Sequence, residues 1–180
     1  MEAREERALI ERAKERDKGA WAEIYERHKQ SIYRYVYYRV GDEGLAEELT
    51  GEVFLRALES IESFTFRGFS LVGWLYRIAK HLVIDHYREQ RQQLDVSLGE
   101  DVAVTEEGPG EIADKRRTCE QLEKALGQLT QEQREVVILR IIDGLPLAEV
   151  AQIMGKTRGA IKSLQHRGLA SLRRILKEAS

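Results

Sequence analysis

The stretch LPLAEVAQIMGKTRGAIKSL, residues 145–164, has the spacing of a helix-turn-helix that reads DNA. Ala151 is followed four residues later by Gly155 and six residues after that by Ile161. The small alanine lets two helices approach closely, the glycine suits a turn with positive φ, and the isoleucine packs the second helix onto the first. We therefore expect the second helix to lie in a major groove, with its N-terminal residues at the base edges.

The composition indicates a soluble, helix-rich protein. Of its 180 residues, 42% are hydrophobic and 33% are charged, and the length suits one large domain or two small ones. No run approaches the roughly 18 apolar residues of a membrane span, so we expect no membrane insertion. The single cysteine, Cys119, excludes an internal disulfide and a Cys-rich metal site, and it fits a reducing cytoplasm.

The net charge of −2 is low for a nucleic-acid binder, but the total conceals two separate blocks. Residues 156–177 contain seven Lys or Arg and no carboxylate. Residues 92–114 contain seven Asp or Glu and no Lys or Arg. The basic block therefore favours a nucleic-acid surface near the C-terminus.

Nearly every long segment has a helical period and none alternates as a strand, which predicts an all-α fold. The first predicted helix ends at Gly41. The later predicted helices cover about 43–60, 71–90, 116–126, 131–142, 147–154 and 157–177. A loop is predicted at 63–70. Periodicity vanishes between 92 and 114, where Gly108-Pro109-Gly110 indicates a flexible acidic linker. We expect an N-terminal helical domain (1–91), the linker (92–114) and a C-terminal helix-turn-helix domain (115–180).

Two apolar faces are expected to be buried. In the first domain the face consists of Trp21, Ile24, Tyr25, Ile32, Tyr35, Val36 and Val40. In the last helix it consists of Ile161, Leu164, Gly168, Leu172 and Ile175.

The other side of the last helix carries candidate DNA contacts. These are Lys156 and Thr157 at the helix start, followed by Arg158, Lys162, Gln165 and His166. Arg and Lys can pair with guanine edges, Gln can pair with adenine, and a helix N-terminus favours phosphate. The alternative is a solvated basic face on a bundle helix.

Aromatic and cationic residues are interleaved between Phe64 and Arg91. A loop contains Phe64, Phe66, Arg67 and Phe69, and the helix after it places Arg77, Lys80, His81 and Arg88 on roughly one face. Stacking accepts any base and cations follow phosphates, so this pattern suits a single strand. The alternative is that the phenylalanines fill a core and that Trp74 packs against Trp21.

An acidic stripe consists of Asp42, Glu43, Glu47, Glu48 and Glu52. These carboxylates have no His partner, so a docking surface for a basic partner fits better than catalysis, and a plain solvated face is the alternative. The chain also lacks a phosphate-cradling Gly loop, a His-Glu-x-x-His pair and the context of a Ser or Cys nucleophile. We expect no catalytic residue, no metal and no cofactor.

Two separate regions resemble one family, the extracytoplasmic-function (ECF) sigma factors of bacterial RNA polymerase. The resemblance is carried by EELTGEVFLRA at 47–57, by FRG at 66–68 with GWLYRIAKHLVID at 73–85, and by LTQEQREVVILR at 129–140 with the helix-turn-helix after it. It covers about residues 20–91 and 115–176, and both regions in this order make the match specific.

The resemblance implies a transcription initiation factor that catalyses no chemistry itself. The implied polymerase-docking residues are Asp42, Glu47, Glu48, Glu52 and Phe54. The residues implied for the −10 element are Phe66, Arg67, Arg77, Lys80, His81 and Arg88. Those implied for the −35 element are Lys156, Thr157, Arg158, Lys162, Ser163, Gln165, His166 and Arg167. The implied partners are core RNA polymerase at its clamp and flap, promoter DNA as duplex and non-template single strand, and an anti-sigma factor.

Three positions depart from the family pattern. His81 stands where Asn is common, Leu164-Gln165 replaces a common Arg-Leu pair, and Gly51 replaces a common Gln. The rival interpretation is a stand-alone helix-turn-helix regulator whose N-terminal half dimerises. That rival predicts symmetric half-sites and tight duplex binding without polymerase.

The acidic charge of the linker predicts that the linker weakens DNA binding by the free protein. Seven acids tethered between two basic surfaces would compete with DNA, because tethering supplies an effective concentration of order mM. Replacing Glu106, Glu107 and Glu111 by glutamine should raise DNA binding by the free protein, as measured by fluorescence anisotropy. Unchanged binding would exclude this fold-back.

Overall fold

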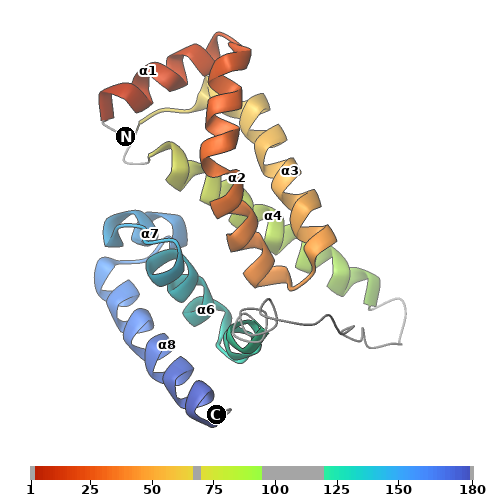
Figure 1. Cartoon of the computed structure of the whole chain (residues 1–180), viewed down its shortest axis with the longest axis vertical. Helices are drawn as coiled ribbons and strands as arrows, with labels where there is room; N and C mark the ends of the chain where they lie inside the picture. Colours follow the sequence, from red (N-terminus) through yellow and green to blue (C-terminus); the bar gives the residue numbers. More distant parts are fainter. Residues whose placement is uncertain (1–2, 67–69, 95–119, 179–180) are drawn as a thin grey trace, which may run out of the picture.

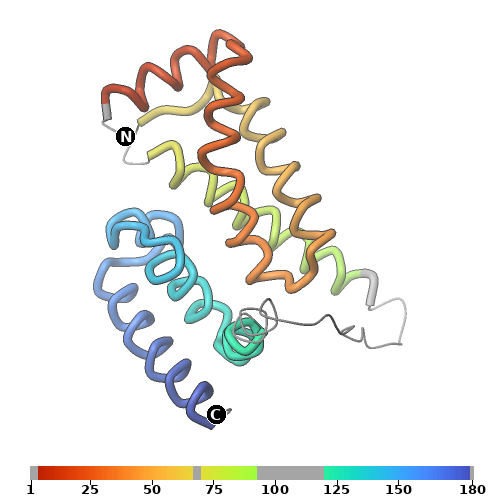
Figure 2. Tube along the Cα trace, viewed as in Figure 1, coloured from red at the N-terminus to blue at the C-terminus, as the bar shows by residue number. Residues whose placement is uncertain are grey.

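The computed structural model describes residues 3–66, 70–94 and 120–178, and none of these residues lies in a strand. The predicted all-α fold is confirmed, and the helices form two groups (Figures 1 and 2). The first group contains α1 (Ala3–Lys14), α2 (Lys18–Val40), α3 (Glu43–Ser60), the 3-10 turn Ile61–Ser63 and α4 (Leu71–Leu94). The second contains helical residues 120–127, α6 (Gln131–Val137), the π-helical turn Ile138–Ile142, α7 (Leu147–Met154) and α8 (Arg158–Glu178).

Local signals explain where the helices of the first group begin and end. Asp17 caps α2 by accepting bonds from the amides of Gly19 and Ala20. Gly41 ends α2 in the left-handed region at φ 73°, and Asp42 then caps α3 through the amide of Leu45 at 2.7 Å. The bounds expected for α3 from the sequence are confirmed.

The core of the first group differs from the expectation in three places. Helix α1 was not expected, yet it buries Leu9, Ile10 and Ala13. Tyr25 was expected to be buried, but 43% of its surface is exposed. Trp74 packs on Phe64, with ring centroids 5.0 Å apart, and the indole of Trp21 donates to the carbonyl of Ala13.

The second group has the predicted helix-turn-helix. Thr130 and Gln133 form a capping box at the start of α6, whose last turn widens into the π-helix. Gly155 ends α7 at φ 63°, and Ile161 is fully buried, as the spacing predicts. Four of the five residues predicted for the inner face of α8 are buried, and Leu172 is half-buried.

The two groups share one continuous core, although the aromatic residues lie only in the first. Helix α4 packs against α7, and α2 packs against the π-helical turn. Helix α4 continues to Leu94, three residues into the predicted linker. The rest of that linker, residues 95–114, and residues 115–119 after it lie outside the described residues. The domain bounds expected from the sequence stay a prediction.

A close approach between α6 and α8 depends on Gly168. A Cβ atom at this position would lie 3.1 Å from Cγ2 of Val137 and 3.4 Å from the carbonyl oxygen of Gln133. The absence of a side chain therefore sets the separation of the two helices.

We expect Gly168→Leu to lower the free energy of unfolding by about 1–3 kcal/mol, because the added side chain overpacks this contact. Gly159→Ala is the matched control on α8, since its Cβ would meet only Thr157, at 4.0 Å. The control should be neutral or slightly stabilising. Urea unfolding measures both, and equal stability of the two variants would contradict the packing argument.

Candidate nucleic-acid interface

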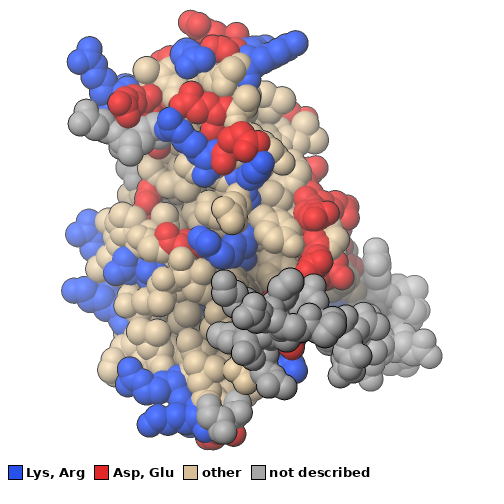
Figure 3. Space-filling view, viewed as in Figure 1, with Lys and Arg blue, Asp and Glu red and all other residues tan. Residues whose placement is uncertain are grey.

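Helix α8, which carries the basic residues, lies at the opposite edge of the molecule from α3 (Figure 1). The turn at Gly155 aims the start of α8 outward, and the Thr157 hydroxyl caps this helix by accepting from the amide of Ala160 at 3.1 Å. The exposed members of the predicted −35 set are Thr157, Arg158, Lys162, Ser163, His166 and Arg167, whereas Lys156 and Gln165 are half-buried. Figure 3 shows blue side chains along this edge.

Lys156 is paired with a carboxylate of α6. Its ammonium lies 2.7 Å from Oε1 of Glu132, whose side chain is 55% exposed. An exposed pair of this kind contributes little to stability, so Lys156 can exchange it for a phosphate.

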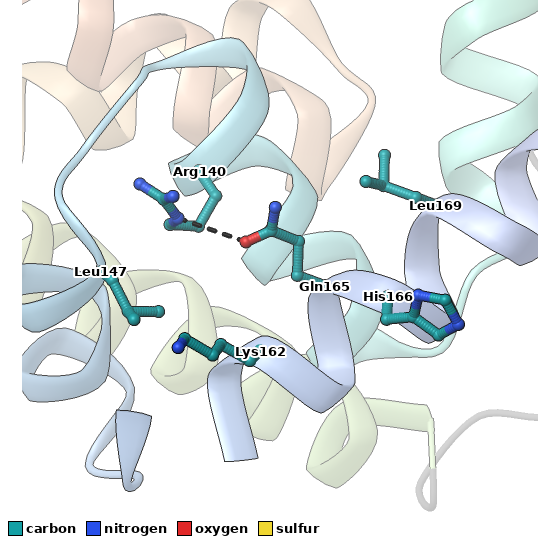
Figure 4. A pocket seen from close by; sticks show the side chains of 6 residues that line it. All are labelled: Arg140, Leu147, Lys162, Gln165, His166 and Leu169. Carbon is teal, nitrogen blue, oxygen red and sulfur yellow. Dashed lines mark hydrogen bonds between the residues drawn. The ribbon is translucent and has the colours of Figure 1, made fainter. Parts of the chain in front are cut away.

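A hollow of about 310 Å³ lies beside α8 and is lined by Arg140, Leu147, Lys162, Gln165, His166 and Leu169 (Figure 4). Nε of Arg140 donates to Oε1 of Gln165 at 3.3 Å. A guanidinium only donates, so the amide oxygen of Gln165 faces Arg140. The oxygen keeps a second lone pair, so the predicted two-bond contact of Gln165 to adenine stays a prediction.

Sequence reasoning missed Arg140. It lies in the π-helical turn, and its Nη1 also donates to the carbonyl of Leu145. The sequence did offer one signal for Arg140, namely a cationic residue shortly before the helix-turn-helix. Its contact with Gln165 depends on a π turn that no local pattern predicts.

The predicted −10 residues are in differing surroundings on α4 and before it. His81 is exposed, and Arg88 lies 3.7 Å from Asp85. Phe66 is half-buried against Phe64, with centroids 5.3 Å apart, and the Arg7 guanidinium stacks over its ring at 5.2 Å. Arg77 is half-buried, and Arg67 lies outside the described residues.

Lys80 is the −10 candidate whose surroundings differ most from the expectation. Its ammonium lies 3.2 Å from Oε1 of Glu135, a buried residue of α6, and its side chain is only 18% exposed. The Tyr35 hydroxyl and an Arg39 nitrogen contact the same oxygen at 3.1 and 3.2 Å. Burial, reinforced by the Glu135 charge, raises the pKa of Tyr35 well above its usual value, so this phenol remains a donor.

The acidic stripe lies at the start of α3, where Figure 3 shows red side chains gathered at one edge. Glu47 and Glu48 are exposed, and Glu52 pairs with Arg56 at 2.9 Å. Phe54, predicted to touch the polymerase, is instead buried against Tyr25, with ring centroids 4.9 Å apart. Phe54 therefore supports α3 from beneath, and docking by the stripe stays a prediction.

Within the described ranges, no three His, Cys, Asp or Glu residues are arranged to hold a metal ion. Among the same residues, no helix is long and apolar enough to cross a membrane.

Comparison with known proteins decides the family. Residues 24–93 match Sigma-70 region 2, and residues 125–174 match Sigma-70 region 4. The chain belongs to the ECF sigma factors. It is 41% identical over 172 residues to the ECF sigma factor BldN of Streptomyces coelicolor, covering 94% of this chain and 65% of that protein. It is 34% identical over 160 residues to SigX of Bacillus subtilis, covering 86% of this chain and 82% of that protein.

Two solved structures share the fold. A structure of CnrH with the cytosolic domain of CnrY superposes with a TM-score of 0.77 at 21% identity, covering 97% of this chain and 99% of that one. RpoE with the anti-sigma factor NepR from Bartonella quintana gives 0.71 at 24% identity, covering 87% and 96%. This ECF sigma factor is thus a transcription initiation factor, and the stand-alone regulator is set aside.

Proposed function

We propose that this ECF sigma factor binds core RNA polymerase and divides promoter reading between its two helical groups. Recognition of the −35 element by the second group is supported by the exposed basic face of α8. The chain has no carboxylate between Lys156 and Lys177. Six of the eight predicted contacts are exposed there, on a helix whose N-terminus suits phosphate. Gln165 donates its amide to a base acceptor, held in that orientation by Arg140.

The −10 element is recognised by the region around the start of α4. The half-buried Phe66 supports stacking of an unpaired base, and the exposed His81 on α4 contacts the same strand. Arg77 and Arg88 follow the phosphates, and Lys80 joins them once it leaves Glu135. Arg67 is included among these residues only because the sequence around it resembles the family's pattern.

The acidic stripe at Glu47, Glu48 and Glu52 docks on the polymerase clamp, and the second group contacts the flap. An anti-sigma factor is proposed as a further partner, because both similar solved structures are complexes with a second protein, which in the RpoE structure is an anti-sigma factor. The sigma factor selects the start site in the cytoplasm, and the polymerase makes the bonds, so no residue here is catalytic.

The direct test is in-vitro transcription with bacterial core polymerase on a library of genomic fragments, with and without this protein. New start sites that share sequences near −35 and −10 are expected. An absence of polymerase-dependent initiation, with gel-shift binding to palindromic duplexes, would contradict the proposal.

Lys162→Ala should weaken binding to a duplex −35 element and lower the slope of log K against log salt by about one, because one phosphate contact is lost. Lys177→Ala is the matched control, since this exposed lysine lies in the last turn of the same helix. Fluorescence anisotropy at several salt concentrations measures both slopes. Equal slopes for the two variants would remove Lys162 from the −35 surface.

A further inference from the structure

Helix α1 lies next to the −10 surface, which consists of Phe66 and the DNA-binding residues proposed on α4. This helix was not expected from the sequence, and it precedes residue 24, where the match to Sigma-70 region 2 begins. It reaches the start of α4 (Figure 1), because Oε1 of Glu6 accepts from the amide of Leu71 at 2.9 Å. None of the DNA-binding residues proposed so far belongs to α1.

The position of α1 is fixed by contacts at both of its ends. Leu9, Ile10 and Ala13 are at most 4% exposed and belong to the core of the first group. The indole of Trp21 donates to the carbonyl of Ala13 at 3.1 Å, which ties the end of α1 to α2. Because Glu6 binds the start of α4 at the other end, the exposed side chains of α1 have defined places.

Arg7 is the exposed side chain of α1 that contacts the −10 surface. Its guanidinium lies over the ring of Phe66, 5.2 Å from the ring centroid. The Phe66 ring is half-buried and meets the ring of Phe64 edge-on, with centroids 5.3 Å apart. An exposed cation over an aromatic ring contributes little to stability, so this contact places the guanidinium rather than holding the fold together.

The hydrogen-bonding capacity of Arg7 is unused by the protein. A guanidinium that stacks on a ring uses its flat face, while its five N–H donors point outward in the plane. Among the residues that the structure describes, none forms an ion pair with Arg7. On the same helix, Glu6 is bound to the amide of Leu71, and Glu11, one turn further along, pairs with Lys14 at 3.3 Å. The guanidinium is therefore free to bind an anion.

The anion that suits this place is a phosphate of single-stranded DNA. A base that stacks on an aromatic side chain brings its own phosphates beside the ring, and cations along that path bind them. Arginine matches a phosphate with two parallel N–H donors. A guanidinium already held against Phe66 loses less side-chain freedom on binding than an unrestrained one.

We infer that Arg7 is a further DNA-binding residue of the −10 surface and holds the phosphate beside the base that stacks on Phe66. This inference rests on the proposed function of Phe66. It extends the −10 surface from α4 onto α1, a helix outside the residues that match Sigma-70 region 2.

The test compares holoenzymes assembled from core polymerase and variants of this sigma factor. The probe is a fluorescein-labelled single strand that carries the non-template −10 sequence of a promoter recovered from the fragment library. We expect Arg7→Gln to bind it several-fold more weakly. We also expect the slope of log K against log salt to fall by about 0.7, because one phosphate contact to a single strand is lost. Fluorescence anisotropy at several salt concentrations measures both, with core polymerase alone as the blank.

Two further variants separate a phosphate contact from a structural role. Arg7→Lys keeps the charge and should retain most of the slope, since an ammonium binds phosphate as a point charge. Lys18→Ala removes an exposed cation at the start of α2, beyond the far end of α1, and should change neither the affinity nor the slope. All three variants should keep the wild-type helical circular dichroism and melting temperature, because both side chains are exposed.

An Arg7→Gln holoenzyme with the wild-type affinity and slope overturns the inference. A weaker affinity with an unchanged slope also overturns it, because Arg7 would then act only through Phe66, and so does an equal loss in Arg7→Lys and Arg7→Gln. Wild-type protein that gives no polymerase-dependent initiation defeats the proposed function, and the inference with it. Normal initiation together with an unchanged Arg7→Gln holoenzyme defeats the inference alone.

Discussion

The Glu135 carboxylate is the constraint on which the arrangement of the two helical groups depends. A carboxylate with 5% of its side chain exposed must be paired, and its three partners all come from α2 and α4. Removing one member of such a buried pair typically costs about 3–5 kcal/mol, whereas an exposed pair contributes less than about 1 kcal/mol. The surrounding apolar core supplies affinity between the groups, and Glu135 fixes the alignment in which they meet.

The surfaces that face solvent follow from that alignment. With α7 packed on α4, the basic face of α8 points away from the first group, and the acidic stripe of α3 lies at a different edge (Figures 1 and 3). The surface proposed for the −35 element is therefore exposed, whereas Lys80 of the surface proposed for the −10 element is paired with Glu135.

Local patterns in the sequence were enough for the bounds of α3 and for the helix-turn-helix, although they missed α1. The spacing of Ala151, Gly155 and Ile161 fixes the turn of the helix-turn-helix, and Gly41 with Asp42 fixes the start of α3. Each of these signals acts within one or two helical turns, where backbone conformation and capping are decided. Tyr25 was misassigned because periodicity gives the side of a helix that is apolar, but not how far its partner helices extend over that side.

The interface between the groups could not be predicted in this way. Tyr35 and Glu135 are 100 residues apart, and nothing near Glu135 distinguishes it from the exposed Glu132 on the same helix. The burial of Phe54 and the role of Arg140 likewise depend on which helices meet in three dimensions. Pairing across a fold is set by packing, which single-sequence periodicity does not encode.

The most direct test of the account is to measure the distance between the two groups in the free protein, with and without the Glu135 carboxylate. Spin labels at Gln30→Cys on α2 and Lys177→Cys on α8, both exposed, with Cys119 replaced by serine, allow pulsed electron paramagnetic resonance to report it. The free protein should give one narrow, short distance. The Glu135→Gln variant should give a broader distribution of distances, because the buried contact that aligns the groups is lost. The same narrow distribution in both proteins would contradict the claim that Glu135 fixes the alignment of the two groups.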